Sequence, residues 1–579
     1  MKYTLRDTLY QKAQEEQGAY RYPFGSRFSV ALCYPNTYEV GMSNLGMQII
    51  YKEINERPDT MAERFFLPDK KELKEYHRTQ TPLMSVESQH GLWEFDMIGI
   101  DITFEMDYFH IPELLSLGRV TVLAAERKEQ EPIVVLGGPC AFFNPEPLAE
   151  FGDVFVIGEG EEVIHRLLDM YISLREEGAD RSEILRRLAK IPGLYVPRFY
   201  EPIYENGRFS HMKREADMPE RIERQWNVLH HHGETVVATP NTEFGAMYLV
   251  EIARGCGRHC RFCMAGYCYR RPRVRSLESV KEAVLRGKKL GKKIGLMGAA
   301  ISDYPYIDEL AAFIREQGMP FSCASLRADS ITPAIVKGLA ESGQKTITLA
   351  PEAGSTAMRD VINKGITDED MYRSIDLAVE AGIRNVRLYI MIGLPWEEDA
   401  DIDAIIEMTQ NIRKYMDERG SGGRLTLSVN LFIPKPMTPF QWLPMVERKE
   451  GERRLKKIHD AFKKTSRIEV RSESVRESYI QSVLARGDRR VGRLIYRAWE
   501  LGGYKCWKQA VKEVGLREEL YLYEPASPGD MQPWDILDMG LAEGYLEREL
   551  EAARQRTFTI PCFSGCNRCT VCKGLPWEE

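Results

Sequence analysis

Three cysteines, Cys256, Cys260 and Cys263, lie within eight residues of one another and are the strongest candidates for chemistry in the chain. Thiolate sulfur is a soft ligand that selects iron–sulfur clusters or zinc. Three closely spaced cysteines without a fourth ligand in register suit a [4Fe–4S] cluster with one open iron. The alternative is a zinc site that uses Cys268 or His259 as fourth ligand, although zinc ligands usually come as two separated pairs. The spacing favours the cluster.

Four further cysteines near the C-terminus also indicate a metal centre. Cys562, Cys566, Cys569 and Cys572 are separated by three, two and two residues, the reverse of a common ferredoxin spacing. Because the four fall in one short segment, we expect a second iron–sulfur cluster in preference to zinc. Four ligands would saturate this cluster and suit an electron relay. If Cys562 is not a ligand, one iron would stay open to bind substrate or sulfur.

The remaining composition places these clusters in an intracellular context. Residues 1–18 are too charged for a signal peptide, and no apolar run approaches the ~20 residues of a membrane helix. We therefore expect a cytoplasmic protein without membrane contact, whose cysteines do not form a disulfide framework. The net charge of −7 argues against indiscriminate coating of nucleic acid. Four scattered cysteines are interpreted as buried hydrophobic residues: Cys33, Cys140, Cys323 and Cys506.

A chain of 579 residues is too long for one hydrophobic core, and we expect domains at 1–235, 236–473 and 474–579. In the first, short apolar runs alternate with helical patterns such as Val163–Leu174, which is typical of an open parallel α/β sheet. Consecutive histidines at 230–232 are interpreted as an exposed linker. The expected strands of the first domain are Phe28–Cys33, Met97–Ile102, Val120–Leu123 and Ile133–Leu136.

The second domain must position the three-cysteine motif, which directly follows its first expected strand. Helical segments such as Leu277–Leu290 and Asp368–Ala381 separate its strands. Repeated β-then-α units predict a barrel or partial barrel that carries its chemistry on the loops after the strands. The third domain is expected to be helical. The expected barrel strands are Tyr248–Ala253, Lys293–Met297, Phe321–Leu326, Thr346–Ala350, Asn385–Ile392 and Thr426–Ile433.

Motifs throughout the second domain resemble those of the radical S-adenosylmethionine (SAM) superfamily. The shared features include the three-cysteine spacing, with Phe262 before the last cysteine. The chain is similar, over nearly its whole length, to an uncharacterised family with an N-terminal cobalamin-binding-like domain and a C-terminal cysteine cluster. This resemblance implies a Rossmann-like open parallel sheet, a partial (β/α)6 radical SAM barrel and a helical C-terminal domain. The other matching segments are Tyr269–Ser276, Ala324–Asp329, Ala350–Ser355, Asn363–Gly365, Ile392–Pro395 and Ala485–Arg490.

The resemblance implies that Cys256, Cys260 and Cys263 hold the [4Fe–4S] cluster, whose open iron binds the amino and carboxylate groups of SAM. Superfamily members have a Gly-Gly-Glu-like turn after the second strand, which binds the SAM amino group. This chain lacks that glutamate and has Ser302 and Asp303 in its place. These two residues, or backbone carbonyls, must substitute for it.

Further SAM contacts are implied after the later strands. Ser325 and Arg327 match the position that meets the SAM carboxylate, where a guanidinium can form two parallel hydrogen bonds. Glu352 matches the contact to the ribose hydroxyls, and Ile392 with Gly393 would pack near adenine. Other interpretations stay open at this point. Arg327 could form a surface ion pair, Glu352 could cap the following helix, and the Ile392–Gly393 segment could be a tight turn.

The resemblance also bears on cofactors and partners of the first domain. The turns at Gly137-Gly138 and Gly158-Glu159 look like those of cobalamin-dependent relatives. The Asp-x-His-x-x-Gly motif of many cobalamin proteins is absent, since Asp107 and His110 have another spacing. Cobalamin is therefore one possibility, and a domain that only shapes the substrate site is the other. A radical SAM enzyme also implies a small reductant protein of the flavodoxin or ferredoxin type.

Charge near the barrel gives a weak indication of substrate. Between Val446 and Arg497, Lys and Arg outnumber Asp and Glu by 16 to 8. Such a run is usually a solvated helix face, but it could bind RNA phosphates, with Arg486, Arg489 and Arg490 as candidates. We expect an enzyme that methylates or methylthiolates a macromolecule, most simply RNA. The alternatives are a small-molecule methylase or cyclase, and an iron–sulfur scaffold or RNA-binding subunit without turnover.

Overall fold

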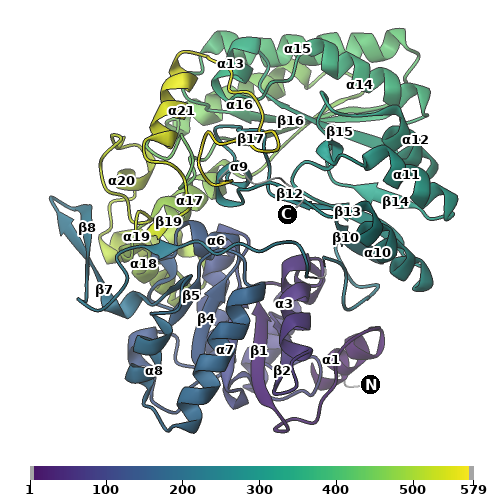
Figure 1. Cartoon of the computed structure of the whole chain (residues 1–579). Helices are drawn as coiled ribbons and strands as arrows, with labels where there is room; N and C mark the ends of the chain where they lie inside the picture. The colour runs from purple at the N-terminus through teal and green to yellow at the C-terminus, as the bar shows by residue number, and fades with distance from the viewer. Residues whose placement is uncertain (1–4, 232, 573–579) are drawn as a thin grey trace. The chain divides into compact units, whose positions relative to one another are not determined.

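The computed structural model describes residues 5–231 and 233–572, so His232 of the expected linker lies outside the described residues. The chain packs as two compact units, coloured along the sequence in Figure 1. Residues of the helical domain expected at 474–579 occur in both units, and the three expected domain boundaries stay predictions. Unit 1 contains Met1–Met247, Val483–Leu520 and Gly529–Gly540, and unit 2 contains Tyr248–Ser482, Tyr521–Pro528 and Leu541–Glu579.

Unit 1 is built on a six-stranded sheet with the order β2-β1-β3-β4-β5-β6. The neighbours from β2 to β5 pair in parallel, and only β6 is antiparallel. Helices α3 (Leu45–Asn55) and α7 (Glu161–Glu176) contact each other beside this sheet. The structure confirms the expected open parallel α/β sheet. Its strands are β1 (Phe28–Tyr34), β2 (Thr60–Phe66), β3 (Met97–Asp101), β4 (Ile133–Gly137), β5 (Val154–Val156) and β6 (Leu194–Tyr195).

One expected strand is absent from this sheet, and β2 and the short strands β5 and β6 were not expected. The segment Val120–Leu123 forms no strand, because the Glu131 carboxylate accepts from the Thr121 N–H and Arg127 donates to the carbonyls of Thr121 and Val122. Side chains thus replace a neighbouring strand as hydrogen-bond partners. The sequence reasoning also missed β2, whose centre carries charged residues. Arg64, only 1% exposed, lies there in ion pairs with Glu16 and Glu87.

Unit 2 contains two sheets that together form a partial barrel. One has the order β10-β13-β14 and the other β15-β16-β17-β18. A parallel bridge between Leu326 and Leu349 joins them at the β14–β15 boundary. All six expected barrel strands are present, and β18 is an additional edge strand. The strands are β10 (Met247–Glu251), β13 (Lys293–Met297), β14 (Phe321–Cys323), β15 (Thr346–Glu352), β16 (Asn385–Ile392), β17 (Leu425–Leu431) and β18 (Ile468–Ser472).

Capping residues start the barrel helices at defined points. The Ser276 side chain accepts from the Ser279 N–H at the start of α10 (Leu277–Lys289). The Ser355 side chain caps α13 (Thr356–Val361) in the same way, and Thr367 forms a capping box at α14 (Asp368–Glu380). Each cap satisfies backbone N–H groups that a helix leaves unpaired at its start. The loops between strand and helix are therefore fixed at both ends.

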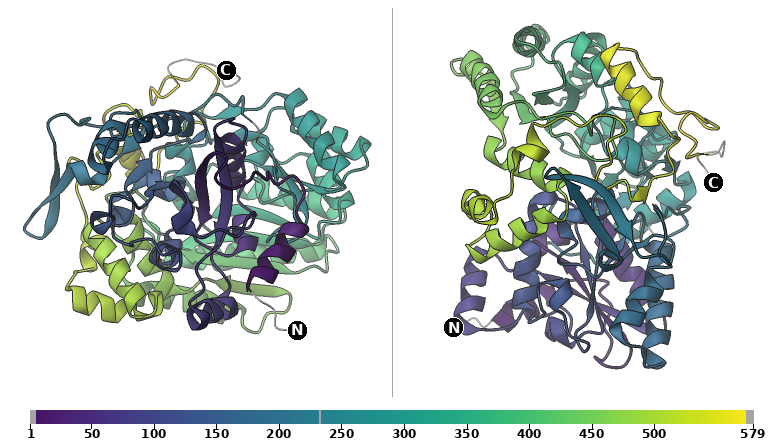
Figure 2. Two further views of the ribbon diagram at one scale, coloured as in Figure 1. Left: turned by 90° about the horizontal axis from the view of Figure 1, so that it is seen from below. Right: turned by 90° about the vertical axis from the view of Figure 1, so that its left-hand side faces the viewer.

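Two further elements lie outside these three sheets. An antiparallel hairpin, β7 (Tyr200–Glu205) and β8 (Arg208–Arg214), extends from unit 1 (Figures 1 and 2). In unit 2, α21 (Tyr545–Arg554) packs against α13, with Leu550 and Ala553 in a shared apolar core. None of the helices in the described part of the chain combines the length and apolar character that a membrane crossing requires.

Candidate iron–sulfur and SAM site

The three cysteines lie on one loop directly after the first barrel strand. We call residues 255–264 the cysteine loop. It is closed at its base by the short pair β11 (Ala253–Arg254) and β12 (Arg273–Val274). Gly255 has φ +82°, and a Cβ there would lie 2.3 Å from the Tyr269 carbonyl oxygen, so the turn requires glycine. The loop therefore holds its cysteines at the end of a barrel strand, where barrel enzymes place reactive groups.

The sulfurs of the cysteine loop are poorly hydrated. Cys260 is buried, and Cys256 and Cys263 are half-buried. Burial raises the pKa of Cys263 to about 12, and the neighbouring Cys260 and Cys256 thiolates add to the rise. Burial and Cys260 likewise raise the pKa of Cys256. Bare thiolates are thus unfavourable here, and iron would provide the missing positive charge. The donor set suits a cluster that takes three soft ligands.

The structure does not gather either cysteine group into a finished ligand set. Among residues 5–231 and 233–572, no three Cys, His, Asp or Glu side chains stand close enough together to hold a metal ion. Cys260 nevertheless raises the pKa of both Cys256 and Cys263, as a nearby negative charge does.

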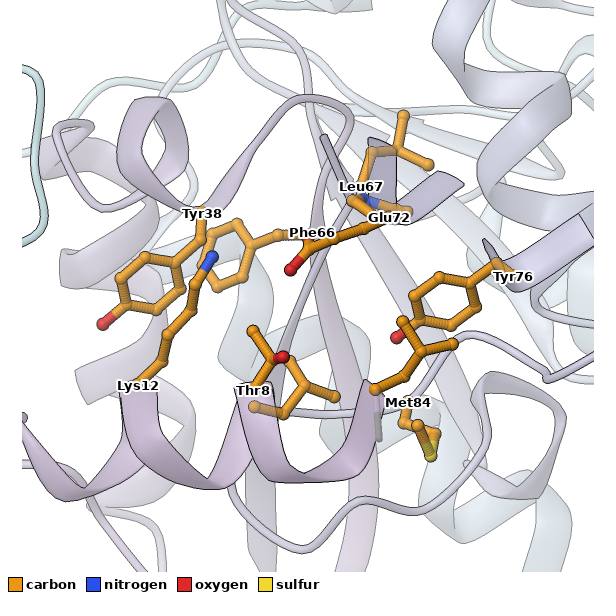
Figure 3. A pocket seen from close by; sticks show the side chains of 11 residues that line it. Thr8, Lys12, Tyr38, Phe66, Leu67, Glu72, Tyr76 and Met84 are labelled. Atoms are coloured by element: carbon orange, nitrogen blue, oxygen red, sulfur yellow. The ribbon is translucent and has the colours of Figure 1, made fainter. Parts of the chain in front are cut away.

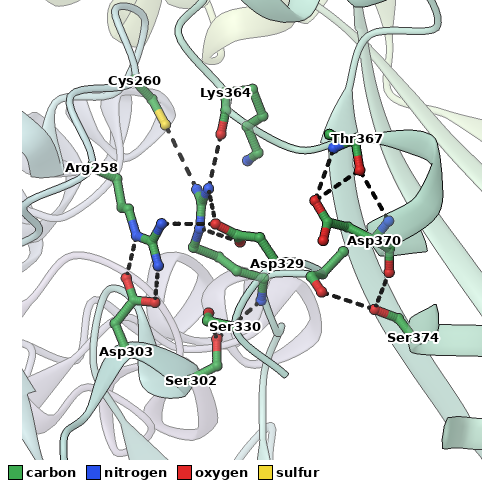
Figure 4. Close-up of polar contacts among 12 residues, drawn as sticks. Arg258, Cys260, Ser302, Asp303, Asp329, Ser330, Lys364, Thr367, Asp370 and Ser374 are labelled. Atoms are coloured by element: carbon green, nitrogen blue, oxygen red, sulfur yellow. Dashed lines mark hydrogen bonds and ion pairs between the residues drawn. The ribbon is translucent and has the colours of Figure 1, made fainter. Parts of the chain in front are cut away.

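A network of alternating charges lies beside the cysteine loop (Figure 4). The Arg258 guanidinium donates to Asp303 and to Asp329, each over 2.7 Å. Asp329 also accepts from Arg327 Nε over 2.9 Å, so one carboxylate joins two guanidinium groups. Burial opposes ionisation of Asp303, but Arg258 outweighs it and lowers the pKa of this carboxyl. The network pairs two guanidinium groups with two carboxylates and is therefore charge-balanced.

This network contains or contacts three of the residues expected to bind SAM, namely Ser302, Asp303 and Arg327. Arg327 Nη1 is directed at Cys260 Sγ over 4.0 Å, while its backbone N–H donates to the Ser302 hydroxyl over 3.2 Å. The Asp303 carboxylate already accepts hydrogen bonds from Arg258, so it is not a separate acceptor for SAM. Ser325 lies beyond the end of β14 and is exposed. Arg258 and Asp329 were not selected from the sequence, although both lie inside motifs that were singled out.

The contacts expected after β15 and β16 also have defined partners. Glu352 has a left-handed backbone, φ 66°, and accepts from Lys364 Nζ over 3.2 Å. It does not cap α13, because Ser355 does. Ile392 is buried at the end of β16. Gly393 has φ +77° and donates its N–H to the Glu397 carboxylate over 2.6 Å, which closes the turn.

Glu397 was not selected from the sequence. Its carboxylate lies in the same turn and pairs with Arg454 over 2.7 Å. Burial raises the pKa of Glu397 to about 7, against the opposing effects of the Gly393 N–H and Arg454. A glutamate four residues after the strand-end glycine is the signal that could have identified it.

The C-terminal cysteine set, Cys562, Cys566, Cys569 and Cys572, lies against the cysteine loop. All four side chains are buried. The Cys562 N–H donates to the Gly257 carbonyl over 2.7 Å. A cavity of about 60 Å³ borders both regions, with Cys256, Arg258, Asp303, Tyr304 and Cys562 among its lining residues. Two cysteine groups that are about 300 residues apart in sequence thus meet in unit 2.

The two glycine turns of the first domain pack closely against residues of their own unit. Gly138 and Gly158 both have positive φ, but added Cβ atoms would meet Ile102 and Gln225 backbone atoms of the same unit. Close packing of the chain on itself therefore explains both glycines. His110 Nδ1 donates to the Pro35 carbonyl and lies 3.3 Å from the Asp107 carboxylate. Cobalamin binding stays a prediction of the resemblance.

A second cavity, this one in unit 1, is small and lies beside α1 (Leu5–Gln14) (Figure 3). Its volume is about 30 Å³, which suits water rather than a cofactor. Lys12 lies over the Tyr38 ring, 5.0 Å from its centroid, at one side of this cavity. Its walls belong to the packing of α1 against the sheet, and we assign it no chemistry.

The basic segment is mostly neutralised by ion pairs, which include two of the three arginines expected to contact RNA, and the RNA contact itself stays a prediction. Arg486 is buried, and Arg489 pairs with Glu146, which is 0% exposed. Arg490 pairs with Asp488 over 2.7 Å. Arg486 and Arg489 are thus held within unit 1, whereas the Arg490 side chain is 27% exposed. Along α16 (Arg448–Phe462), carboxylates likewise pair with Arg448, Arg453, Arg454, Lys456 and Lys457.

Comparisons with known proteins agree with this arrangement. A family model described as the radical SAM superfamily matches residues 250–409, and one described as the N-terminal part of radical SAM proteins matches residues 46–197. The uncharacterized protein MJ0966 of Methanocaldococcus jannaschii is 30% identical over 477 residues, which cover 81% of this chain and 90% of that protein.

Two further similarities concern enzymes. A tRNA-2-methylthio-N(6)-dimethylallyladenosine synthase of Bdellovibrio bacteriovorus is 25% identical over 258 residues, covering 41% of this chain and 54% of that enzyme. The chain therefore matches about half the length of that relative. The radical SAM methyltransferase TsrM of Kitasatospora setae, solved with cobalamin and a [4Fe–4S] cluster, is 16% identical. Its TM-score is 0.46, with 70% of this chain and 72% of that chain covered.

Proposed function

Because this chain belongs to the radical SAM superfamily, we propose that it cleaves SAM reductively at a [4Fe–4S] cluster held by Cys256, Cys260 and Cys263. The observation that carries the proposal is the cysteine loop itself, which follows the first strand of a parallel barrel and lies beside a charge-balanced network. With an electron from a small flavodoxin- or ferredoxin-type protein, the bound cluster and SAM supply a 5′-deoxyadenosyl radical.

The residues around the loop have separate tasks in this proposal. Asp329 fixes the Arg327 guanidinium by two hydrogen bonds and leaves Nη1 directed at Cys260. Nε and Nη2 are engaged by Asp329 and the Lys364 carbonyl, so Arg327 can offer Nη1 to the SAM carboxylate in a fixed orientation. Glu352, steadied by Lys364, accepts from the ribose hydroxyls. Buried apolar residues such as Ile392 exclude water from the reacting atoms.

The test of SAM cleavage is direct. Anaerobically reconstituted, reduced protein is expected to form 5′-deoxyadenosine from SAM, and Cys260→Ala or Cys263→Ala to abolish it. Cys323→Ala is the matched control, because Cys323 is also buried in unit 2 but lies outside both cysteine groups. Equal product from the wild type and the Cys260→Ala protein would refute the proposal.

The radical is used, in the same proposal, to transfer a methyl or methylthio group to an RNA base. The similarity to a tRNA methylthiotransferase supports this substrate class. Mass spectrometry of RNA nucleosides from cells lacking the gene, complemented with the wild-type or the Cys256→Ala gene, tests it. We expect one modified nucleoside to disappear and to return only with the wild-type gene.

A small-molecule substrate is the second candidate. The observation in its favour is the pairing of Arg489 with Glu146 and of Arg453 with Asp399, which removes much of the basic surface expected for RNA. Unchanged RNA nucleosides in the gene-deletion experiment, together with a metabolite difference that the wild-type gene restores, would favour this candidate.

A further inference from the structure

We propose that the C-terminal cysteine set holds a second iron–sulfur cluster, and that His259 of the cysteine loop donates a hydrogen bond to its Cys562 thiolate. The inference goes beyond SAM cleavage, because it concerns a separate metal centre and the residue that links it to the first. It rests on the burial of four sulfurs, on the contacts of the two segments, on the tautomer of His259 and on nearby guanidinium groups.

The two segments are fitted to each other at Gly257. A Cβ at this position would lie 2.9 Å from the Cys562 Cβ, so only glycine allows the observed approach. The Cys562 N–H and the Gly257 carbonyl are joined over 2.7 Å at the same point. Asn363 makes a second connection between the segments. Its side-chain amide donates to the Thr559 carbonyl and accepts from the Thr559 N–H. The C-terminal cysteine set is therefore anchored beside the cysteine loop.

The hydrogen bonds of His259 determine which ring nitrogen carries the proton. Arg270 Nη2 lies 2.7 Å from His259 Nδ1, and an arginine can only donate. The Tyr545 hydroxyl also lies 2.7 Å from Nδ1. Nδ1 is therefore an acceptor. Arg568 Nη2 lies 3.5 Å from Nε2, a contact too long to outweigh the two at 2.7 Å, so Nε2 carries the hydrogen. Nε2 lies 2.9 Å from Cys562 Sγ, so His259 donates an N–H···S hydrogen bond.

Two guanidinium groups, one buried and one half-buried, complement the four sulfurs. The Arg270 side chain is fully buried, and its positive charge acts on Cys562 and Cys569. Arg568 Nε donates to Cys566 Sγ over 3.4 Å and is held by the Pro561 carbonyl. Guanidinium groups this close to sulfur would be costly beside four neutral thiols. They are expected beside a centre with four thiolate ligands, which carries net negative charge.

The spacing of the ligands favours iron–sulfur over zinc. Zinc sites usually combine two cysteine pairs from separate turns, whereas here all four ligands come from one short segment. None of the four is in a disulfide. Donors to the cluster sulfurs raise its reduction potential, because they stabilise the more negative reduced state. His259 would thus be a positioning residue that sets this potential from within the SAM-cluster loop.

The first experiment measures metal in a variant that cannot hold the SAM cluster. Anaerobically reconstituted protein with Cys256, Cys260 and Cys263 replaced by alanine is expected to keep about four irons per chain, and wild type about eight. Adding Cys566→Ala and Cys569→Ala should remove the remaining iron, whereas adding Cys323→Ala should not. Absence of iron in the triple variant, or zinc in its place, would overturn the proposal. This result is independent of SAM cleavage, which the triple variant lacks.

The second experiment tests His259 in the same triple-alanine background. His259→Met has similar bulk but no donor, and His259→Gln restores an N–H near the position of Nε2. We expect the midpoint potential of the remaining cluster to become more negative in the His259→Met variant and to return toward its original value in the His259→Gln variant. The electron paramagnetic resonance signal of the cluster should change with Met and be restored with Gln. Equal potentials in all three proteins would overturn the role of His259. If the His259→Met variant binds no iron, iron binding by the His259→Gln variant supports the role of His259. Absence of iron from both variants refutes it.

Discussion

At the scale of single residues, the site depends on charged groups that hold one another in place. Arg327 is fixed by Asp329, and Asp329 is shared with Arg258 on the cysteine loop. The sequence pattern predicted Arg327 as a SAM contact because it lies after a barrel strand. The sequence could not show that Asp329 orients the Arg327 guanidinium. The two residues lie two positions apart on an irregular loop, and only the structure shows that their side chains pair.

We predict that Arg327→Lys weakens SAM binding about tenfold, a loss of about 1.4 kcal/mol. A lysine ammonium cannot reproduce the planar pair of donors or the bidentate contact with Asp329. Equilibrium dialysis of anaerobic protein with SAM measures the Kd. Arg315→Lys is the matched control, because Arg315 pairs with Glu341 on the outside of the barrel. A Kd that is the same for both variants would contradict the assignment.

Glu397 leads to a prediction about pH. Burial raises its pKa from 4.5 to about 7, so the folded state binds the proton more tightly than the unfolded chain does. Its contribution to stability is therefore full below about pH 4.5 and is lost as the pH rises to 7, a change of about 3 kcal/mol. Glu397→Gln is neutral throughout and should lack this change. Urea unfolding of both proteins at pH 5 and pH 8 measures it, and parallel pH profiles would count against it.

At the scale of elements, alternating and apolar runs identified most of the parallel strands, including all six expected in unit 2. The misses have physical causes. β2 carries Arg64 and Glu63 at its centre, and only their buried partners make that pattern compatible with a strand. Val120–Leu123 has strand-like residues, but side-chain acceptors satisfy its backbone. Long-range partners of this kind cannot be inferred from one sequence.

The same limit applies to α18 (Arg490–Glu500) and the turn before it, where charge alone suggested an RNA surface. Arg489 instead pairs with the fully buried Glu146. We predict that Arg489→Ala lowers the free energy of unfolding by about 3 kcal/mol, because it leaves a buried carboxylate without its partner. Arg493→Ala, with a side chain 75% exposed, is the control and should change it by less than about 0.5 kcal/mol. Urea denaturation distinguishes the two, and equal effects would refute the structural role.

At the scale of the molecule, the C-terminal segment completes the site that begins near residue 256. Arg261 is fully buried beside Cys260, and it donates to the Thr557 carbonyl over 2.6 Å and to the Asp360 carbonyl over 2.9 Å. The sequence predicted both cysteine groups, but nothing in their spacing predicted that one would pack on the other. That contact arises only when the barrel brings α13 and α21 together.

We therefore predict that truncation after Arg556 lowers the melting temperature of the anaerobic protein by roughly 5–10 °C, since buried Arg261 loses charge-assisted hydrogen bonds. It should also lower iron binding at the cysteine loop, whose support is removed. The matched control replaces Cys562, Cys566, Cys569 and Cys572 with serine in the full chain. That variant keeps the Thr557 and Thr559 contacts, so it should retain about four irons per chain. Thermal denaturation and iron analysis of both proteins test the idea, and a truncated protein with wild-type melting and iron at the cysteine loop would show that the C-terminal segment does not support the site.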